Sequence, residues 1–290
     1  MGSSVQLPSA VDPDRIDAFC NRVWEEGRQH YRVLPWRHID DAYAVLVSEV
    51  MLQQTQVSRV IRYWKRFLDR FPTIDALASA ESGAVLEIWQ GLGYNRRALM
   101  LKHCAETCSE QWGGELPHAY QDLVSLPGIG PATAAGVRSF AWNKPGVYLE
   151  TNVRSVFLYE WFPDAQEPVR DKQLIPLIEA TCSQDNPRDW YYALLDYGAY
   201  LKSTHPNPSR CSAHHTRQST FEGSRRQKRA EIVRLVLEEP GIVLDDIVER
   251  LNELEVSAGR TPVESDVAAS IVGDLLKEGF FHEEQGRFRC

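Results

Sequence analysis

The segment whose residue types and spacing point most clearly to a binding function is a glycine-rich turn. It consists of Leu126–Gly130 (LPGIG) and is followed directly by Pro131. Gly128 and Gly130 allow a tight turn and let backbone N–H groups come close to a ligand. Pro131 suits the first position of a helix, because a proline there forfeits no helical hydrogen bond. A glycine turn that leads into a helix N-terminus can bind a phosphate without any basic side chain. Taken alone, the pattern fits an ordinary corner between two helices equally well.

Helical periodicity surrounds this turn and predicts an all-α region. Apolar residues recur every three or four positions, and the predicted helices are 43–71 (a helix and its successor), two short helices starting near 73 and 82, and 97–108, 121–126, 133–142, 152–162, 171–182 and 189–201. A turn is expected at 91–94, where two glycines stand close together. No alternation typical of a strand precedes residue 235.

The C-terminal part changes character. Residues 203–224 are polar and proline-rich, which indicates a loop. Three helices follow at 225–237, 245–254 and 265–277, and then a short hairpin with its turn near 284–286. Three helices and a hairpin suggest a winged-helix module. We therefore predict a main helical domain at 13–202, a linker at 203–224 and a winged-helix-like domain at 225–290.

The net charge of −8 is unevenly distributed along the 290 residues. Residues 235–290 hold 13 acidic and 5 basic residues, so the tail carries the whole excess and the rest is neutral. A basic cluster precedes the tail, and it is either a phosphate-facing surface or a solvated linker face: Arg210, Arg217, Arg225, Arg226, Lys228 and Arg229.

Other features lead us to expect a cytoplasmic protein. No run of 18 apolar residues predicts a membrane span, and the N-terminus has no secretion signal. None of the six cysteines forms a CxxC pair. Cys104 and Cys108 are expected to be small buried apolar residues rather than metal ligands.

Four sets of motifs carry a family resemblance: LPWR at 34–37, SEVMLQQTQ at 48–56, GLGY at 91–94 together with the glycine turn, and LETNVR at 149–154. In this order and spacing they resemble the helix-hairpin-helix DNA glycosylases over about residues 18–202. The MutY adenine glycosylase branch is the better match, since endonuclease III-like proteins carry no Glu at position 49. The resemblance implies an all-α helix-hairpin-helix glycosylase fold for residues 13–202, with the winged-helix-like module behind it.

The reaction of this family breaks a base–sugar bond after the nucleotide has been flipped out of the duplex. Loss of a purine needs a proton donor at the base and negative charge near the sugar, where a cation develops. The resemblance makes Glu49 the acid, although periodicity alone would favour a solvated helix residue. At position 150 the family has Asp, and Glu150 is longer and expected to have a less fixed head. A helix starting near Thr151 should favour the ionised form of Glu150, and Asn152 matches the family residue that helps to position the catalytic water.

The resemblance also assigns DNA contacts. Gln54 and Tyr94 match residues that probe or wedge the duplex, with an ordinary core aromatic as the alternative for Tyr94. Further DNA-binding positions belong to the turn and the next helix: Leu126, Gly128, Gly130, Ala132 and Thr133. Bifunctional relatives have a lysine at position 132 that forms a Schiff base. Because Ala132 has no amine, the resemblance implies a glycosylase without lysine-type lyase activity.

Two departures concern the region after residue 200. The family usually binds a [4Fe–4S] cluster with four cysteines here, but residues 200–223 contain only Cys211, so we expect a clusterless member without a metal cofactor. A zinc site from Cys211, His205, His214 and His215 lacks a standard spacing. The prediction leaves open a monovalent cation at the hairpin. MutY proteins also carry a Nudix-like C-terminal domain, for which 225–290 is too short and too helical.

The sequence therefore predicts a nucleoid-associated DNA repair enzyme that removes a mispaired or damaged base, adenine first, from double-stranded DNA. Its acidic module would repel phosphate and suits a protein partner better. Two alternatives stay open. One is a non-catalytic DNA-binding scaffold on the same fold, and the other is a glycosylase for uracil, thymine or alkylated bases.

Overall fold

The computed structural model describes residues 12–216 and 220–290. They form two compact units. Of the described residues, unit 1 comprises 12–49, 117–125 and 129–216, and unit 2 comprises 50–116, 126–128 and 220–290. The chain crosses between the units inside helix α2 (Ala42–Leu52) and again in the glycine turn. The described residues are mostly helical, as predicted, and none of their helices is long and apolar enough to cross a membrane.

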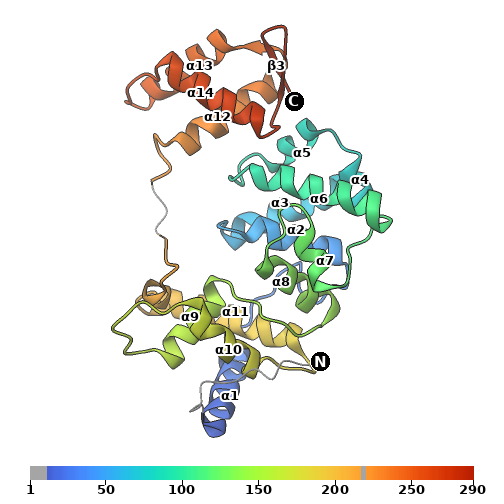
Figure 1. The fold of residues 1–290 in the computed structure, drawn as a ribbon. Helices are drawn as coiled ribbons and strands as arrows, with labels where there is room; N and C mark the ends of the chain where they lie inside the picture. The colour runs from blue at the N-terminus through green and yellow to red at the C-terminus, as the bar shows by residue number, and fades with distance from the viewer. Residues whose placement is uncertain (1–11, 217–219) are drawn as a thin grey trace. The chain divides into compact units, whose positions relative to one another are not determined.

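Unit 1 is built around one long helix. Its elements are α1 (Pro13–Gln29), the start of α2, α7 (Tyr120–Ser125), α8 (Pro131–Trp142), α9 (Thr151–Trp161), α10 (Asp171–Thr181), α11 (Pro187–Thr204) and the 3-10 turn η1 (Pro208–Cys211). Helix α11 packs against α1, α8 and α9, and Figure 1 shows α9 and α11 side by side. The aromatic residues Trp190, Tyr191 and Phe157 are completely buried in this core.

Two elements of unit 1 differ from the sequence analysis. Helix α1 was not predicted, although Asp12 caps it by accepting a hydrogen bond from the Asp14 N–H (3.0 Å) and Pro13 starts it. Only a few of its residues are buried, so its apolar stripe is short. Residues 203–224 are not all loop, because α11 runs on to Thr204 and η1 follows.

The first part of unit 2 consists of α3 (Val57–Arg70), α4 (Ile74–Ala78), α5 (Ser82–Trp89) and α6 (Arg96–Trp112). Helix α6 packs on α4 and α5. The rings of Phe67 and Trp89 meet edge to face in the core, with centroids 5.9 Å apart. Thr73 starts α4 as predicted, because its hydroxyl accepts the N–H of Ala76 (3.1 Å).

The C-terminal part of unit 2 has the order α12 (Arg225–Glu238), β1 (Ile242–Val243), α13 (Leu244–Ser257), α14 (Ser265–Lys277), β2 (His282–Glu284) and β3 (Arg287–Arg289). The strands form an antiparallel sheet in the order β1-β3-β2, with Ile242 opposite Phe288. Gln285 and Gly286 both have positive φ, which suits a two-residue hairpin turn. This is the expected winged-helix arrangement. Strand β1 was missed because two residues are too short to show alternation.

Candidate active site

Glu49, on α2, is enclosed within unit 1 rather than solvated. Its carboxyl group accepts a hydrogen bond from the hydroxyl of Tyr148 and lies against Gly136 of α8. A Cβ atom at Gly136 would collide with the Glu49 carboxyl group and come within 2.9 Å of the Tyr148 ring. Glycine at 136 therefore makes room for the carboxyl group. The solvated interpretation, which periodicity alone favoured, is wrong.

This environment keeps Glu49 protonated at neutral pH. Burial raises the pKa of its carboxyl group to about 8, the hydrogen bond from Tyr148 lowers the pKa, and the negative charge of Glu150 raises it. Glu49 nevertheless keeps some exposed surface. A protonated carboxyl group that is enclosed but not sealed off is suited to act as a general acid.

Tyr148 is itself held rigidly. Its backbone N–H donates to the hydroxyl of Tyr191 (3.2 Å), which in turn donates to the carbonyl of Gly146. Its ring packs edge to face on Phe140, with centroids 5.1 Å apart. Burial raises the pKa of the Tyr148 hydroxyl well above its usual value, as do the charges of Glu49 and Glu150. Tyr148 is therefore a fixed, neutral hydrogen-bond donor toward Glu49.

Glu150 is the N-cap residue of α9. Its Oε1 atom accepts the backbone N–H groups of Asn152 (2.6 Å) and Val153 (3.0 Å). The expected less fixed head is therefore wrong, because the two bonds anchor the carboxylate. The helix start was predicted correctly, but its effect was overestimated. Burial raises the pKa of Glu150 above its usual value, and the two backbone bonds only partly offset this shift.

Asn152 lies directly beside this cap. Its N–H group donates to Glu150, and its side-chain Oδ1 accepts a hydrogen bond from Lys202 of α11 (3.1 Å). Unit 1 therefore brings together the three residues predicted for catalysis, Glu49, Glu150 and Asn152, in one electrostatically coupled group.

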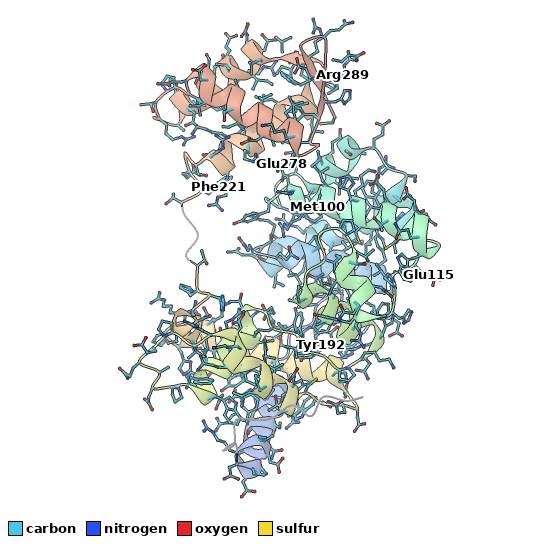
Figure 2. The ribbon with its side chains drawn as sticks, in the orientation of Figure 1. Met100, Glu115, Tyr192, Phe221, Glu278 and Arg289 are labelled. Carbon is cyan, nitrogen blue, oxygen red and sulfur yellow. The ribbon has the colours of Figure 1, made fainter. Side chains whose placement is uncertain are left out.

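The glycine turn has two different glycines. Gly128 has φ +74°, and a Cβ atom there would lie 2.6 Å from Cβ of Met100 on α6, the residue labelled in Figure 2. Gly130 has an ordinary φ of −87° and caps α8, which begins at Pro131 as predicted. A Cβ atom at Gly130 would meet nothing within 4 Å. The first glycine thus permits the turn and the second leaves the helix N-terminus open to a ligand.

The remaining positions around the turn are mostly interior. Leu126 and Thr133 are buried, so only their backbones could contact a phosphate. Ala132 is partly exposed in the first turn of α8. The side chains of Leu126 and Thr133 therefore contribute to packing and not to direct contact with DNA.

Gln54 and Tyr94 lie in unit 2 on two backbone turns with positive φ, +56° and +50°. Arg97 of α6 joins the turns: its guanidinium donates to the carbonyl of Gln53 (2.6 Å) and to that of Gly93 (2.9 Å). Gln54 is exposed, and Tyr94 is 37% exposed. The core interpretation of Tyr94 is therefore wrong, and the role of both side chains as duplex probes stays a prediction.

The segment after α11 is held by packing and hydrogen bonds. Turn η1 packs on α9, and Val169 exchanges backbone hydrogen bonds with Cys211 (2.9 Å) and Ala213 (2.8 Å). Within residues 12–216 and 220–290, no three His, Cys, Asp or Glu side chains are grouped as a metal site would require. The donor set of 200–223, a single thiol, does not fit an iron–sulfur cluster.

Most of the basic cluster is paired within the C-terminal module. Arg225 donates to Asp274 (2.5 Å), and Arg229 donates to Glu278 (2.8 Å), which Figure 2 labels. Lys228 lies 3.3 Å from the buried carboxylate of Glu255. Arg226 donates to the hydroxyl of Tyr94 (2.8 Å). Arg217 lies outside the described residues. These contacts favour a structural role for the cluster over a phosphate-facing one.

Comparison with known proteins defines the class. Residues 47–179 match the family model described as "HhH-GPD superfamily base excision DNA repair protein". Residues 47–179 thus carry the domain of this superfamily, as the motifs predicted, and the chain is MutY-like in sequence. Its fold is similar to that of "a thermostable thymine-DNA glycosylase", with a TM-score of 0.61, 22% identity and coverage of 68% of this chain and 92% of that one. It is also similar to the structure of a "non-covalent Endonuclease III-DNA complex". The TM-score is 0.52 and the identity 17%, and the match covers 72% of this chain and 91% of that one.

The similar curated proteins are adenine DNA glycosylases. The one from Mycobacterium tuberculosis is 39% identical over 195 residues, which cover 66% of this chain and 64% of that protein. The one from Buchnera aphidicola is 34% identical over 170 residues, which cover 59% of this chain and 48% of that protein. The human one is 34% identical over 199 residues, which cover 65% of this chain and 36% of that protein. The chain spans about half the length of the curated relatives it matches.

Three residues of the site were missed by sequence reasoning: Tyr148, Lys202 and Arg97. Tyr148 lies two positions before Glu150, and that spacing in an extended segment was the one available signal. Lys202 bonds to Asn152, 50 residues away, and Arg97 bonds to the carbonyl of Met51, 46 residues away. A local sequence pattern cannot predict contacts over such separations.

Proposed function

We propose that this chain is a monofunctional DNA glycosylase of base excision repair, which hydrolyses the N-glycosidic bond of adenine in mispaired or damaged double-stranded DNA. The observation that carries the proposal is the state of Glu49, whose enclosed carboxyl group has a pKa near 8. A purine leaves readily once its ring is protonated, and a carboxyl group that holds its proton at neutral pH can donate it. The similarity to adenine DNA glycosylases supports adenine as the base.

The other groups of the site have complementary roles. Glu49 protonates the adenine ring, and Tyr148 then stabilises the carboxylate that forms. Glu150 provides negative charge near the developing sugar cation. Two backbone bonds hold its carboxylate, so little reorganisation is needed during the reaction. Asn152 orients the attacking water together with Glu150.

DNA is bound by the glycine turn and by the probing residues. The open N-terminus of α8 at Gly130 binds a phosphate through its backbone N–H groups. Gln54 and Tyr94 fill or wedge the duplex after the base has left the stack. Ala132 has no amine, so the abasic strand stays intact. No step needs a metal, and the single thiol in 200–223 supports a clusterless enzyme.

The proposal is tested by measuring base release in single-turnover experiments on a panel of duplexes with adenine, uracil, thymine or an alkylated purine in defined mispairs. Adenine release with an intact strand that breaks only in hot alkali is expected. Glu49→Gln and Glu150→Gln should each lower the rate by about 10²–10⁴, and Glu110→Gln, at an exposed position of α6, should not change it. Both catalytic variants should still bind the duplex.

Glu150→Asp is the informative variant, because it restores the residue of the family. Aspartate keeps a good helix cap but withdraws the carboxylate by one methylene group from its position beside Glu49. We expect the rate to fall about a hundredfold, since a displacement of about 1 Å has that effect. A wild-type protein that binds duplexes but releases no base would favour the scaffold alternative, and release of a pyrimidine but not adenine would overturn the choice of base.

A further inference from the structure

Helix α11 approaches the first turn of α9 unusually closely. A Cβ atom at Gly198 would collide with the backbone carbonyl of Asn152 and lie 2.8 Å from its Cβ atom. Only glycine permits this distance. Lys202 stands four residues further along α11, and positions four apart share one face of a helix. The close approach at Gly198 thus brings the Lys202 ammonium group to the Asn152 side chain, where it donates to Oδ1 at 3.1 Å.

This hydrogen bond also sets the direction of the Asn152 amide. An ammonium group can only donate, so its partner must be the amide oxygen. The amide nitrogen of Asn152 consequently points away from Lys202 and is available as a donor. Orienting an attacking water molecule requires such a directed donor.

Of the two cations that face Glu150 in the described part of the chain, Lys202 is the one without an ion-pair partner. The charged and titratable groups that face Glu150 are Glu49 of α2, Tyr148 of the extended segment, Arg154 of α9 and Lys202 of α11. Arg154 forms a bidentate ion pair with Asp171 (3.0 and 2.9 Å). Among the described residues, Lys202 has no carboxylate oxygen within 4.0 Å, and its bonded partner is a neutral amide.

We propose that Lys202 is a positioning residue of the active site, which orients the Asn152 amide and holds Glu150 in its ionised form. This role rests on the proposed function, in which Glu150 must be negatively charged. Burial of Glu150 favours its neutral acid, and the positive charges of Lys202 and Arg154 oppose that shift of its pKa. Because Arg154 is committed to Asp171, the balance depends on Lys202.

The catalytic test compares Lys202→Met, which keeps the chain length without the charge, with Lys202→Arg, which keeps the charge. Single-turnover adenine release is measured from pH 5 to 9. In Lys202→Met the acid limb of the profile, which follows Glu150 ionisation, should move to higher pH by about one unit, which corresponds to about a tenfold loss of rate at pH values on that limb. Lys202→Arg should keep the limb in place. A uniform loss with an unmoved limb in Lys202→Met would mean a merely structural role and would overturn the proposal.

A second measurement needs no catalysis. Chemical unfolding of wild type, Lys202→Met, Glu150→Gln and the double variant forms a thermodynamic cycle. We expect the coupling between the two positions to be larger at pH 7.5 than at pH 4.5, because the ionised fraction of Glu150 increases with pH. Absence of coupling at both pH values would overturn the proposal even if no base release were detected. Failure of wild type to release any base, with the pH-dependent coupling intact, would refute only the proposed function.

Discussion

The hydroxyl group of Tyr148 donates a hydrogen bond to the carboxyl group of Glu49, and this bond modifies the pKa shifts that burial causes in both side chains. The bond is stronger when Glu49 is ionised, because a carboxylate is the better acceptor. Tyr148 therefore limits how far burial raises the pKa of Glu49. It would also stabilise the carboxylate that remains after the proton has passed to a base.

Tyr148→Phe should therefore raise the pKa of Glu49 further above 8. In the proposed reaction, the alkaline limb of base release would move to higher pH by about one unit, and the maximal rate would fall because the product carboxylate loses its donor. The matched control is Tyr191→Phe, which removes the hydroxyl behind Tyr148 and should lower stability without moving the limb. An unshifted limb in Tyr148→Phe would contradict this account of Glu49.

Glu49→Gln should make the folded protein more stable at neutral pH. The pKa of Glu49 in the folded protein, about 8, is higher than the ordinary glutamate value of 4.5, so the folded state binds the proton more tightly than the unfolded state does. The contribution of Glu49 to the free energy of unfolding is therefore fully present below about pH 4.5 and is lost as the pH rises toward 8. At pH 7 the loss is roughly 3 kcal/mol, from about 1.4 kcal/mol per pH unit. Glutamine stays neutral and avoids this loss.

Urea unfolding of wild type and Glu49→Gln at pH 5 and pH 7 measures the difference. The gain in Glu49→Gln should be small at pH 5 and largest at pH 7, whereas Glu110→Gln should show no such trend. An equal effect at both pH values would mean that Glu49 titrates normally in the folded protein.

Gly130→Ala should weaken duplex binding without unfolding the protein. Alanine can adopt the φ of −87° found at Gly130, and the added Cβ atom would meet nothing within 4 Å. The methyl group would, however, lie at the helix N-terminus where a phosphate is proposed to bind. We expect about a tenfold loss of affinity and a stability change below about 1 kcal/mol. Gly128→Ala is the contrast, because a positive φ and the contact with Met100 should lower its melting temperature clearly. Unchanged affinity in Gly130→Ala would exclude a phosphate at this position.

Neutralising the paired arginines of the C-terminal module should have little effect on DNA affinity. Arg225→Gln and Arg229→Gln remove partners of Asp274 and Glu278. If these arginines are structural, the dissociation constant should change less than about twofold and its salt dependence should stay the same. Fluorescence anisotropy at several salt concentrations decides the point. A shallower salt dependence in either variant would show that the arginine contacts a phosphate.

The purified protein should contain no iron and keep its fold in the presence of a chelator. One cysteine in 200–223 cannot hold a cluster, and η1 instead packs on α9 with backbone bonds to Val169. Elemental analysis and the melting temperature with and without chelator check this. Stoichiometric iron, or a large loss of stability on chelation, would refute the clusterless interpretation.

The sequence by itself determined most of the local structure of this protein and its similarity to the helix-hairpin-helix glycosylases. The turn and the helix after it are predicted by Gly128, Gly130 and Pro131. Glycine widens the range of accessible backbone angles and proline narrows it, and both effects are local. The position of Glu49 within its motif identified the candidate acid. Helix periods, likewise, depend only on neighbours three or four residues apart.

The tertiary structure decided the chemical state of those residues. Glu49 holds its proton because distant segments, among them Gly136 of α8, bury its carboxyl group, while the hydrogen bond from Tyr148 limits how far its pKa rises. Glu150 is enclosed as well, so burial outweighs the helix start that was expected to keep its pKa low. Lys202 reaches Asn152 only because Gly198 lets two helices touch. A pKa depends on the solvent exclusion and charges around a group, and these arise from contacts between distant segments.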